Sequence, residues 1–111
     1  MEREARKYLL DARTAAGVIL DVLKGQMYQD YLGSIVLRSA VERQFQILGE
    51  AIYQVQKQFP SILPAIPGHR EIIRFRHMLV HHYDKIENEV VWGIAKVHLD
   101  PFIKTIDSLL L

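Results

Sequence analysis

Residues Ser34–Pro60 read SIVLRSAVERQFQILGEAIYQVQKQFP, and their apolar side chains recur at intervals of three and four. This period places the apolar residues on one side of an α-helix. Ser34 is a residue type that caps helix N-termini, and Pro60 marks the end because proline cannot continue a helix. The segment therefore predicts a long helix that buries one stripe. The stripe consists of Leu37, Val41, Phe45, Leu48, Ile52, Val55 and Phe59.

The flanking segments have the same period. An apolar stripe from Ala5 to Leu23 predicts a first helix that ends near Gly25, with a short connector over residues 26–33. Prolines place a loop at residues 61–68, and a third helix should follow over about residues 69–83.

The last helix should begin at residue 87 or 88, and Pro101 inside its pattern should kink or split it. No useful segment alternates with period two. The sequence thus predicts an all-α fold, an antiparallel four-helix bundle with a kinked last helix. A length of 111 residues, half of them apolar, suits a single domain over residues 1–111.

Composition excludes several classes of protein. There is no cysteine, which removes disulfides, thiolate zinc sites and thiol catalysis and fits a reducing cytoplasm. No apolar run has the length of a membrane span, and the charged N-terminus lacks a signal peptide. We therefore expect a cytoplasmic protein with no membrane partner.

Positive charge gathers in residues 69–85, which contain four of the 14 Lys and Arg residues, two acids and four of the five histidines. Such a concentration suits an anion site, and a solvated helix face is the alternative. Within it, Arg76–Tyr83 reads R-x4-H-x-Y. Arginine matches phosphate geometry and histidine transfers protons near neutral pH, so the motif could cut a phosphodiester without a metal.

Helix geometry limits this interpretation. At about 100° per residue, Arg76 and Tyr83 share a face, whereas His81 lies about 140° from Arg76. The three side chains converge only if the helix ends or distorts near His81, or if a second protomer completes the site. Otherwise His81 is a cation at a helix end and Tyr83 an edge of the core.

His77 and His81 have a spacing that can bind a metal on a helix face. Met78 stands where the zinc-protease pattern needs glutamate, and no third ligand is evident, so we assign no metal site. On the second helix, Glu50 could pair with an arginine of the third helix or lie exposed. Gly49 is costly in mid-helix and is best explained by close approach of a neighbouring helix.

Four ordered blocks of the chain resemble the HepT-like family of HEPN-domain proteins. They are Val41-Glu42-Arg43 with Ile47-Leu48-Gly49-Glu50-Ala51, Ile66-Pro67-Gly68-His69-Arg70-Glu71-Ile72-Ile73, Arg76-His77-Met78-Leu79-Val80-His81-His82-Tyr83, and Val91-Trp92-Gly93-Ile94 with Leu99-Asp100-Pro101. The third block matches the family's R-x4-H-x-Y signature.

The resemblance implies a single HEPN domain that acts as the ribonuclease toxin of a toxin–antitoxin pair of type II or VII. It implies Arg76 and His81 as catalytic residues at a homodimer interface, with no cofactor. It also implies a minimal nucleotidyltransferase antitoxin that adds AMP to Tyr83. RNA, with tRNA as the first choice, would be the substrate, and no DNA partner is expected.

Glu50 matches a family glutamate to which we assign a supporting role, as we do to His77 and His82. The family usually has asparagine at the position of His77 and a small or polar residue at that of His82. The two extra imidazoles could influence His81 or supply a second acid. A rival reading is a catalytically inactive HEPN module that only docks a nucleotidyltransferase.

Overall fold

The computed structural model describes all residues, Met1–Leu111, and contains helices and no strand. The predicted all-α fold is therefore confirmed. The elements in chain order are α1 (Arg3–Leu23), α2 (Tyr28–Gly33), α3 (Ile35–Gln58), the 3-10 helix η1 (Pro60–Ala65), α4 (His69–His81), the 3-10 helix η2 (Tyr83–Lys85), α5 (Asn88–Val97) and α6 (Leu99–Leu110). None of these helices is both long and apolar enough to cross a bilayer.

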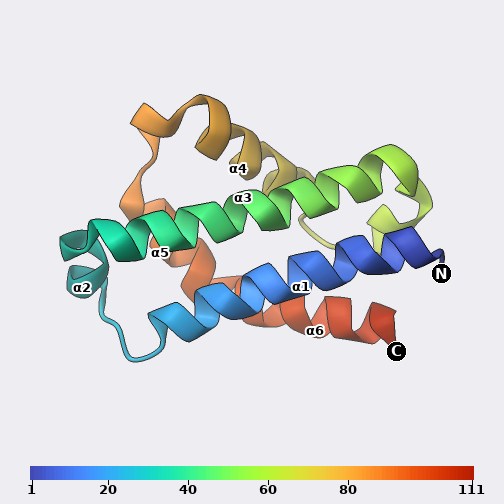
Figure 1. Cartoon of the computed structure of the whole chain (residues 1–111), viewed down its shortest axis with the longest axis horizontal. Helices are drawn as coiled ribbons and strands as arrows, with labels where there is room; N and C mark the ends of the chain where they lie inside the picture. The colour runs from blue at the N-terminus through green and yellow to red at the C-terminus, as the bar shows by residue number, and fades with distance from the viewer.

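The two longest helices, α1 and α3, run antiparallel and form the centre of the bundle (Figure 1). The Ser34 hydroxyl accepts a hydrogen bond from the Leu37 N–H at 3.1 Å, so the predicted N-cap of α3 is confirmed. The helix ends at Gln58, two residues before Pro60, as the sequence indicated. Its predicted stripe is buried except for the partly buried Leu37 and Phe59 at its ends.

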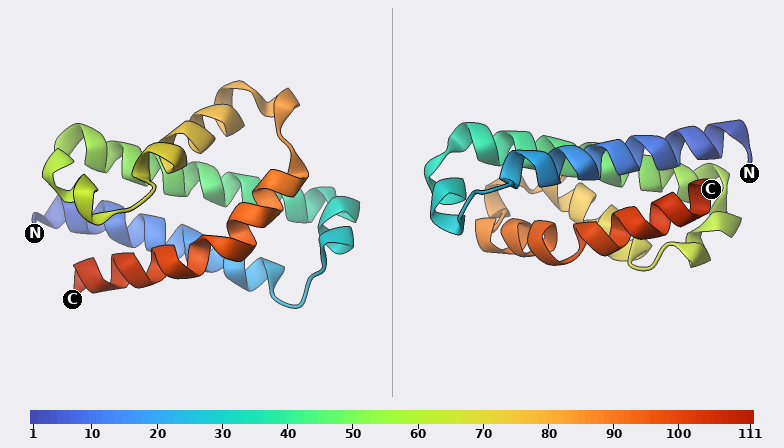
Figure 2. Two further views of the ribbon diagram at one scale, coloured as in Figure 1. Left: turned by 180° about the vertical axis from the view of Figure 1, so that it is seen from behind. Right: turned by 90° about the horizontal axis from the view of Figure 1, so that it is seen from below.

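The last two long elements complete an up-and-down arrangement. α4 packs against α3, and α6 packs against α1, so the chain termini lie at the same end of the bundle (Figure 2). The predicted break at Pro101 takes the form of a split. α5 ends at Val97, α6 begins at Leu99, and Pro101 lies in the first turn of α6, where its missing N–H costs no helical hydrogen bond.

Three segments differ from the sequence prediction. The connector over residues 26–33 contains the helix α2, and the loop over residues 61–68 contains η1. Tertiary packing accounts for α2, because Tyr31 is fully buried and its ring lies 5.6 Å from that of Trp92. The third helix ends at His81, two residues before the predicted end.

Tyr31 is the largest fully buried side chain, and its hydroxyl has no hydrogen-bond partner. Burial raises the pKa of this hydroxyl to about 12, and the nearby Glu42 carboxylate adds to the shift. Trp92 lies partly buried between Tyr28, Tyr31 and the ammonium of Lys96. The structure therefore places Trp92 at the edge of the core.

Candidate functional site

Arg76 lies on the side of α4 that faces α3, opposite Gly49. A Cβ atom built on Gly49 would lie 2.2 Å from the Cβ and 2.8 Å from the Cγ of Arg76. Real Cβ atoms do not approach so closely, so only glycine permits this separation of the two helices. The close helix approach that was predicted from Gly49 is confirmed, and it fixes the stem of Arg76 against α3.

The guanidinium of Arg76 forms an ion pair with Glu50, as the sequence suggested. Arg76 Nη2 lies 2.8 Å from Glu50 Oε2, and the two side chains are 26% and 42% exposed. Glu50 Oε2 nevertheless accepts no hydrogen bond, so no N–H of Arg76 points directly at this oxygen. Glu50 Oε1 instead accepts one from the Gln54 amide at 2.9 Å. The pair is thus a close charge contact that leaves Arg76 donors available.

Arg76 and Glu50 line a small cavity of about 260 Å³ between α1, α3 and α4. The ring of Tyr53 lies 5.8 Å from the Arg76 guanidinium carbon, which adds a cation–π contact. The cavity also contains Asp11 and Arg43, so its wall carries both signs of charge. An anion that enters here would meet Arg43 and Arg76, and contacts with α3 hold the Arg76 side chain in place.

The three motif histidines form a cluster at the C-terminal end of α4. The rings of His77 and His81 are 4.5 Å apart with an interplanar angle of 45°, and His82 lies 5.9 Å from His77. All three side chains are exposed. His82 closes the helix, because its backbone N–H donates to the Met78 carbonyl at 2.8 Å.

His77 and His81 belong to a longer row on the outer face of α4. Arg70, Arg74, His77 and His81 recur at intervals of four, three and four, which places them on one helix face, and all four are exposed. Neither arginine is in an ion pair. We call these four residues the basic row. The local concentration of positive charge was predicted from the sequence but the row was not, although its spacing is visible there.

Tyr83 lies outside α4, in η2, and 76% of its surface is exposed. The helical geometry that put Tyr83 on the same face as Arg76 was therefore wrong, because the chain leaves the helix after His81. The early end of α4 fulfils one of the two conditions stated for a joint site. Arg76 nevertheless faces α3 while His81 faces outward, and no hydrogen bond or ion pair connects them.

A single chain does not enclose these residues in one cavity. Neither His81 nor Tyr83 lines either of the two main cavities. No group of three or more histidine, cysteine, aspartate or glutamate side chains has an arrangement that could hold a metal ion.

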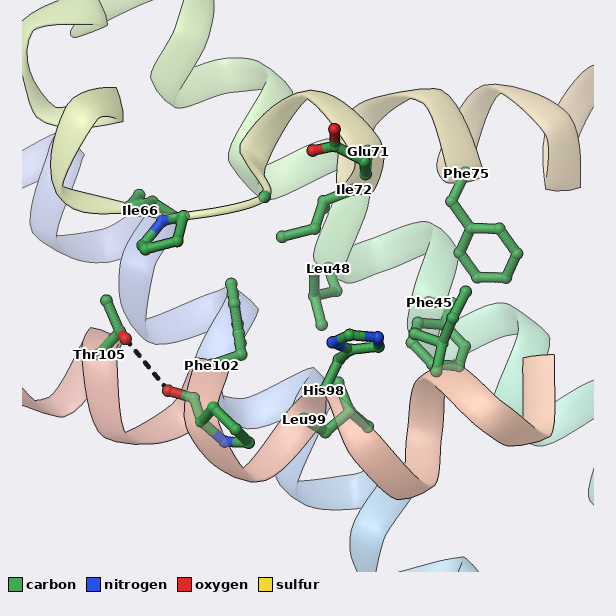
Figure 3. Close-up of a pocket in the computed structure, with 14 residues that line it drawn as sticks. Phe45, Leu48, Ile66, Glu71, Ile72, Phe75, His98, Leu99, Phe102 and Thr105 are labelled. Carbon is green, nitrogen blue, oxygen red and sulfur yellow. Dashed lines mark hydrogen bonds between the residues drawn. The ribbon is translucent and has the colours of Figure 1, made fainter. Parts of the chain in front are cut away.

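The larger cavity, of about 650 Å³, lies between α4 and α5–α6 above α3 (Figure 3). Its wall is mostly apolar, with three phenylalanine rings, Phe45, Phe75 and Phe102. Its polar groups include Glu71, His98 and Thr105, whose hydroxyl donates to the Pro101 carbonyl at 3.1 Å. None of the predicted site residues lines this cavity.

Comparison with known proteins identifies the family of the chain. Residues 12–109 match the family model described as Ribonuclease HepT-like. A protein of Methanocaldococcus jannaschii named as a candidate RNase is 26% identical over 106 residues, 96% of each chain. A protein of Thermococcus cleftensis named as a probable ribonuclease HepT is 31% identical over 96 residues, 86% of each chain. No solved structure matches. The chain therefore belongs to the HepT-like ribonuclease family.

Proposed function

We propose that this chain is the toxin of a toxin–antitoxin pair and cleaves RNA, with tRNA as the first substrate to test, in a cleft shared by two copies. Family membership supports a ribonuclease. The observation that carries the finer proposal is the position of Arg76 and His81 on different sides of the last turns of α4. Because one chain does not bring them together, a second chain would have to complete the site.

Each residue has a distinct chemical task in this proposal. RNA supplies its own nucleophile, the 2′-hydroxyl, so the enzyme needs proton transfer and charge stabilisation. Arg76, with donors not directed at Glu50, would bind the scissile phosphate. His81 would transfer protons. Glu50 would keep Arg76 in position, and the basic row would attract the RNA backbone.

A homodimer that joins the two α4 helices would bring two basic rows near one cleft. Arg70 and Arg74 would then face like charges on the partner, which is unfavourable unless an anion lies between them. A polyanionic RNA strand meets this condition. The arrangement is therefore better suited to RNA than to a neutral substrate.

Cleavage should continue in the presence of a metal chelator, because proton transfer by histidine and charge stabilisation by arginine need no metal. The test incubates the purified chain with tRNA and with total RNA, with and without EDTA, and resolves products on denaturing gels. The chain with Arg76→Ala and His81→Ala together is the control for contaminating nucleases.

We expect the same fragments with and without chelator, and none from the control. Loss of cleavage in EDTA with recovery on adding zinc would contradict the metal-free mechanism and favour a His77–His81 metal site. An inactive wild-type chain that still binds a nucleotidyltransferase would favour the docking module instead.

The second part of the proposal is regulation through Tyr83 by a nucleotidyltransferase antitoxin. The Tyr83 oxygen would attack the α-phosphorus of ATP, pyrophosphate would leave, and the phenolic proton would pass to solvent. Tyr83 suits this reaction because it is 76% exposed and follows the histidine cluster directly. The attached AMP would place an anion and a bulky base beside His81 and His82, which would compete with the RNA phosphate.

Tyr83→Phe should therefore remain active but escape silencing by the partner enzyme. The measurement is mass spectrometry of the chain co-expressed with a nucleotidyltransferase, followed by cleavage assays. Tyr28→Phe is the matched control, because Tyr28 lies in α2 and contacts Trp92. AMP found on another tyrosine, or silencing of Tyr83→Phe as complete as that of the wild type, would refute this part.

A further inference from the structure

His77 occupies a position that an RNA-cleaving site can use directly. Its ring lies 4.5 Å from the ring of His81, one turn further along the same exposed face of α4. Neither ring makes a side-chain hydrogen bond within the chain. Two imidazoles therefore present free nitrogen atoms to solvent within the reach of one phosphate group.

RNA cleavage through the 2′-hydroxyl needs two proton transfers. One group takes the proton from the 2′-oxygen as that oxygen bonds to phosphorus. Another gives a proton to the 5′-oxygen as its bond to phosphorus breaks, which leaves a 2′,3′-cyclic phosphate and a 5′-hydroxyl. One imidazole cannot take and give a proton in the same step, so His81 requires a partner, either His81 of the second copy or another group of its own chain.

Within the same chain, the surroundings of His81 offer few candidates. From α4 itself, Arg70 and Arg74 share its face, and arginine stays protonated. From α3, Glu50 lies on the opposite side of α4 and holds Arg76.

The short helix η2 contributes Tyr83, Asp84 and Lys85 beyond the end of α4, after His82. His82 is a weaker candidate than His77, because it closes the helix and its ring contacts the ring of His77. His77 is thus the one titratable side chain in direct ring contact with His81.

We propose that His77 is a second catalytic residue, which with His81 divides the two proton transfers of RNA cleavage within one protomer. This inference rests on the proposed ribonuclease function. The asparagine usual at this position in the family cannot transfer a proton near neutral pH, so this division of the two transfers would be particular to chains with histidine here. Arg74, one helical turn before His77, would hold the adjacent phosphate.

The test compares wild type, His77→Asn and, as the matched imidazole control, His98→Asn, each checked for helicity by circular dichroism. His98 is exposed and lies outside the motif. The pH dependence of kcat and KM is measured on RNA. It is repeated on a nucleoside 3′-(4-nitrophenyl phosphate), whose leaving group needs no proton. His77→Asn should lower kcat on RNA by about 10² or more with little change in KM, and should abolish one limb of the bell-shaped pH profile.

The nitrophenyl ester then identifies the role of His77. Recovery of the His77→Asn rate on the ester means that His77 gives the proton to the leaving oxygen, and no recovery means that it takes the 2′ proton. If the wild-type enzyme is active and His77→Asn keeps both its rate and the two limbs of its pH profile, this inference alone is refuted. An inactive wild type would refute the proposed function and this inference together.

Discussion

Replacing Gly49 by alanine is expected to destabilise the protein and to weaken RNA cleavage, although alanine is the better helix former. The new methyl group would lie 2.2 Å from the Arg76 Cβ and 3.4 Å from its Cα. These atoms sit at the base of the side chain, so rotation of the arginine cannot move them away. α3 and α4 must separate, and overpacking of this kind costs about 1–3 kcal/mol.

Gly93→Ala is the matched control. Gly93 lies inside α5, and a Cβ built on it meets no atom within 4 Å. The same substitution there should stabilise the protein by up to about 1 kcal/mol through helix propensity alone. Thermal unfolding separates the two variants, because 1 kcal/mol shifts Tm by roughly 4–8 °C in a domain of about this size. Equal stability of both variants would contradict the close contact between α3 and α4.

The substitution Gly49→Ala should affect RNA cleavage as well as stability. The position of the Arg76 guanidinium depends on this contact and on Glu50, so separated helices would displace the phosphate-binding group. Gly49→Ala should lose cleavage activity at temperatures where it is still folded. Gly93→Ala should retain it, which distinguishes displacement of Arg76 from general loss of helix packing.

The sequence predicted two kinds of feature. Some follow from the local preferences of a residue, and others from a residue that is unfavourable in its own helix. Ser34 is a good N-cap in any context, and the stripe of α3 follows from its period. Gly49 is unfavourable in a helix, so its presence indicated a close neighbour, and the structure identifies Arg76 as that neighbour. Glu50 beside an inward-facing stripe similarly indicated a charge partner.

The prediction placed the end of α4 two residues too late, because residues 80–85 contain neither glycine nor proline to mark it. The helix stops where His82 adopts φ −131° and ψ 44°, a conformation open to any residue. The helix α2 was not predicted either, because its helical turn is fixed by burial of Tyr31 in the core. Tertiary packing of Tyr31 decides α2, and such packing leaves no periodic signal in the sequence.

The two faces of α4 explain why the motif alone did not define a site. Arg76 points to α3, whereas His77 and His81 belong to the outer basic row. A linear motif fixes the angle between its side chains around the helix axis, which is about 140° from Arg76 to His81. It does not say which surface closes over them. That surface must come from RNA or from a second chain.

Arg76→Ala and His81→Ala should each lower the rate of RNA cleavage by about 10² to 10⁴, the usual cost of losing charge stabilisation or proton transfer. Arg6→Ala and His98→Ala are matched controls, because both residues are exposed, lie outside the motif and do not line the cavity of Arg76. Cleavage rates at saturating RNA, with circular dichroism as a check on folding, provide the measurement. Activity of either motif variant close to that of its control would remove that residue from the mechanism.

Co-expression of the two inactive variants then tests whether each site combines residues of two chains. In a mixed dimer, one site would carry both substitutions, and the other would pair the intact Arg76 of one chain with the intact His81 of its partner. Random pairing gives half mixed dimers with one working site of two, so about one quarter of wild-type activity should return. No recovery would mean that Arg76 and His81 act within one chain. Since the isolated chain separates the two side chains, RNA binding would then have to draw them together across α4.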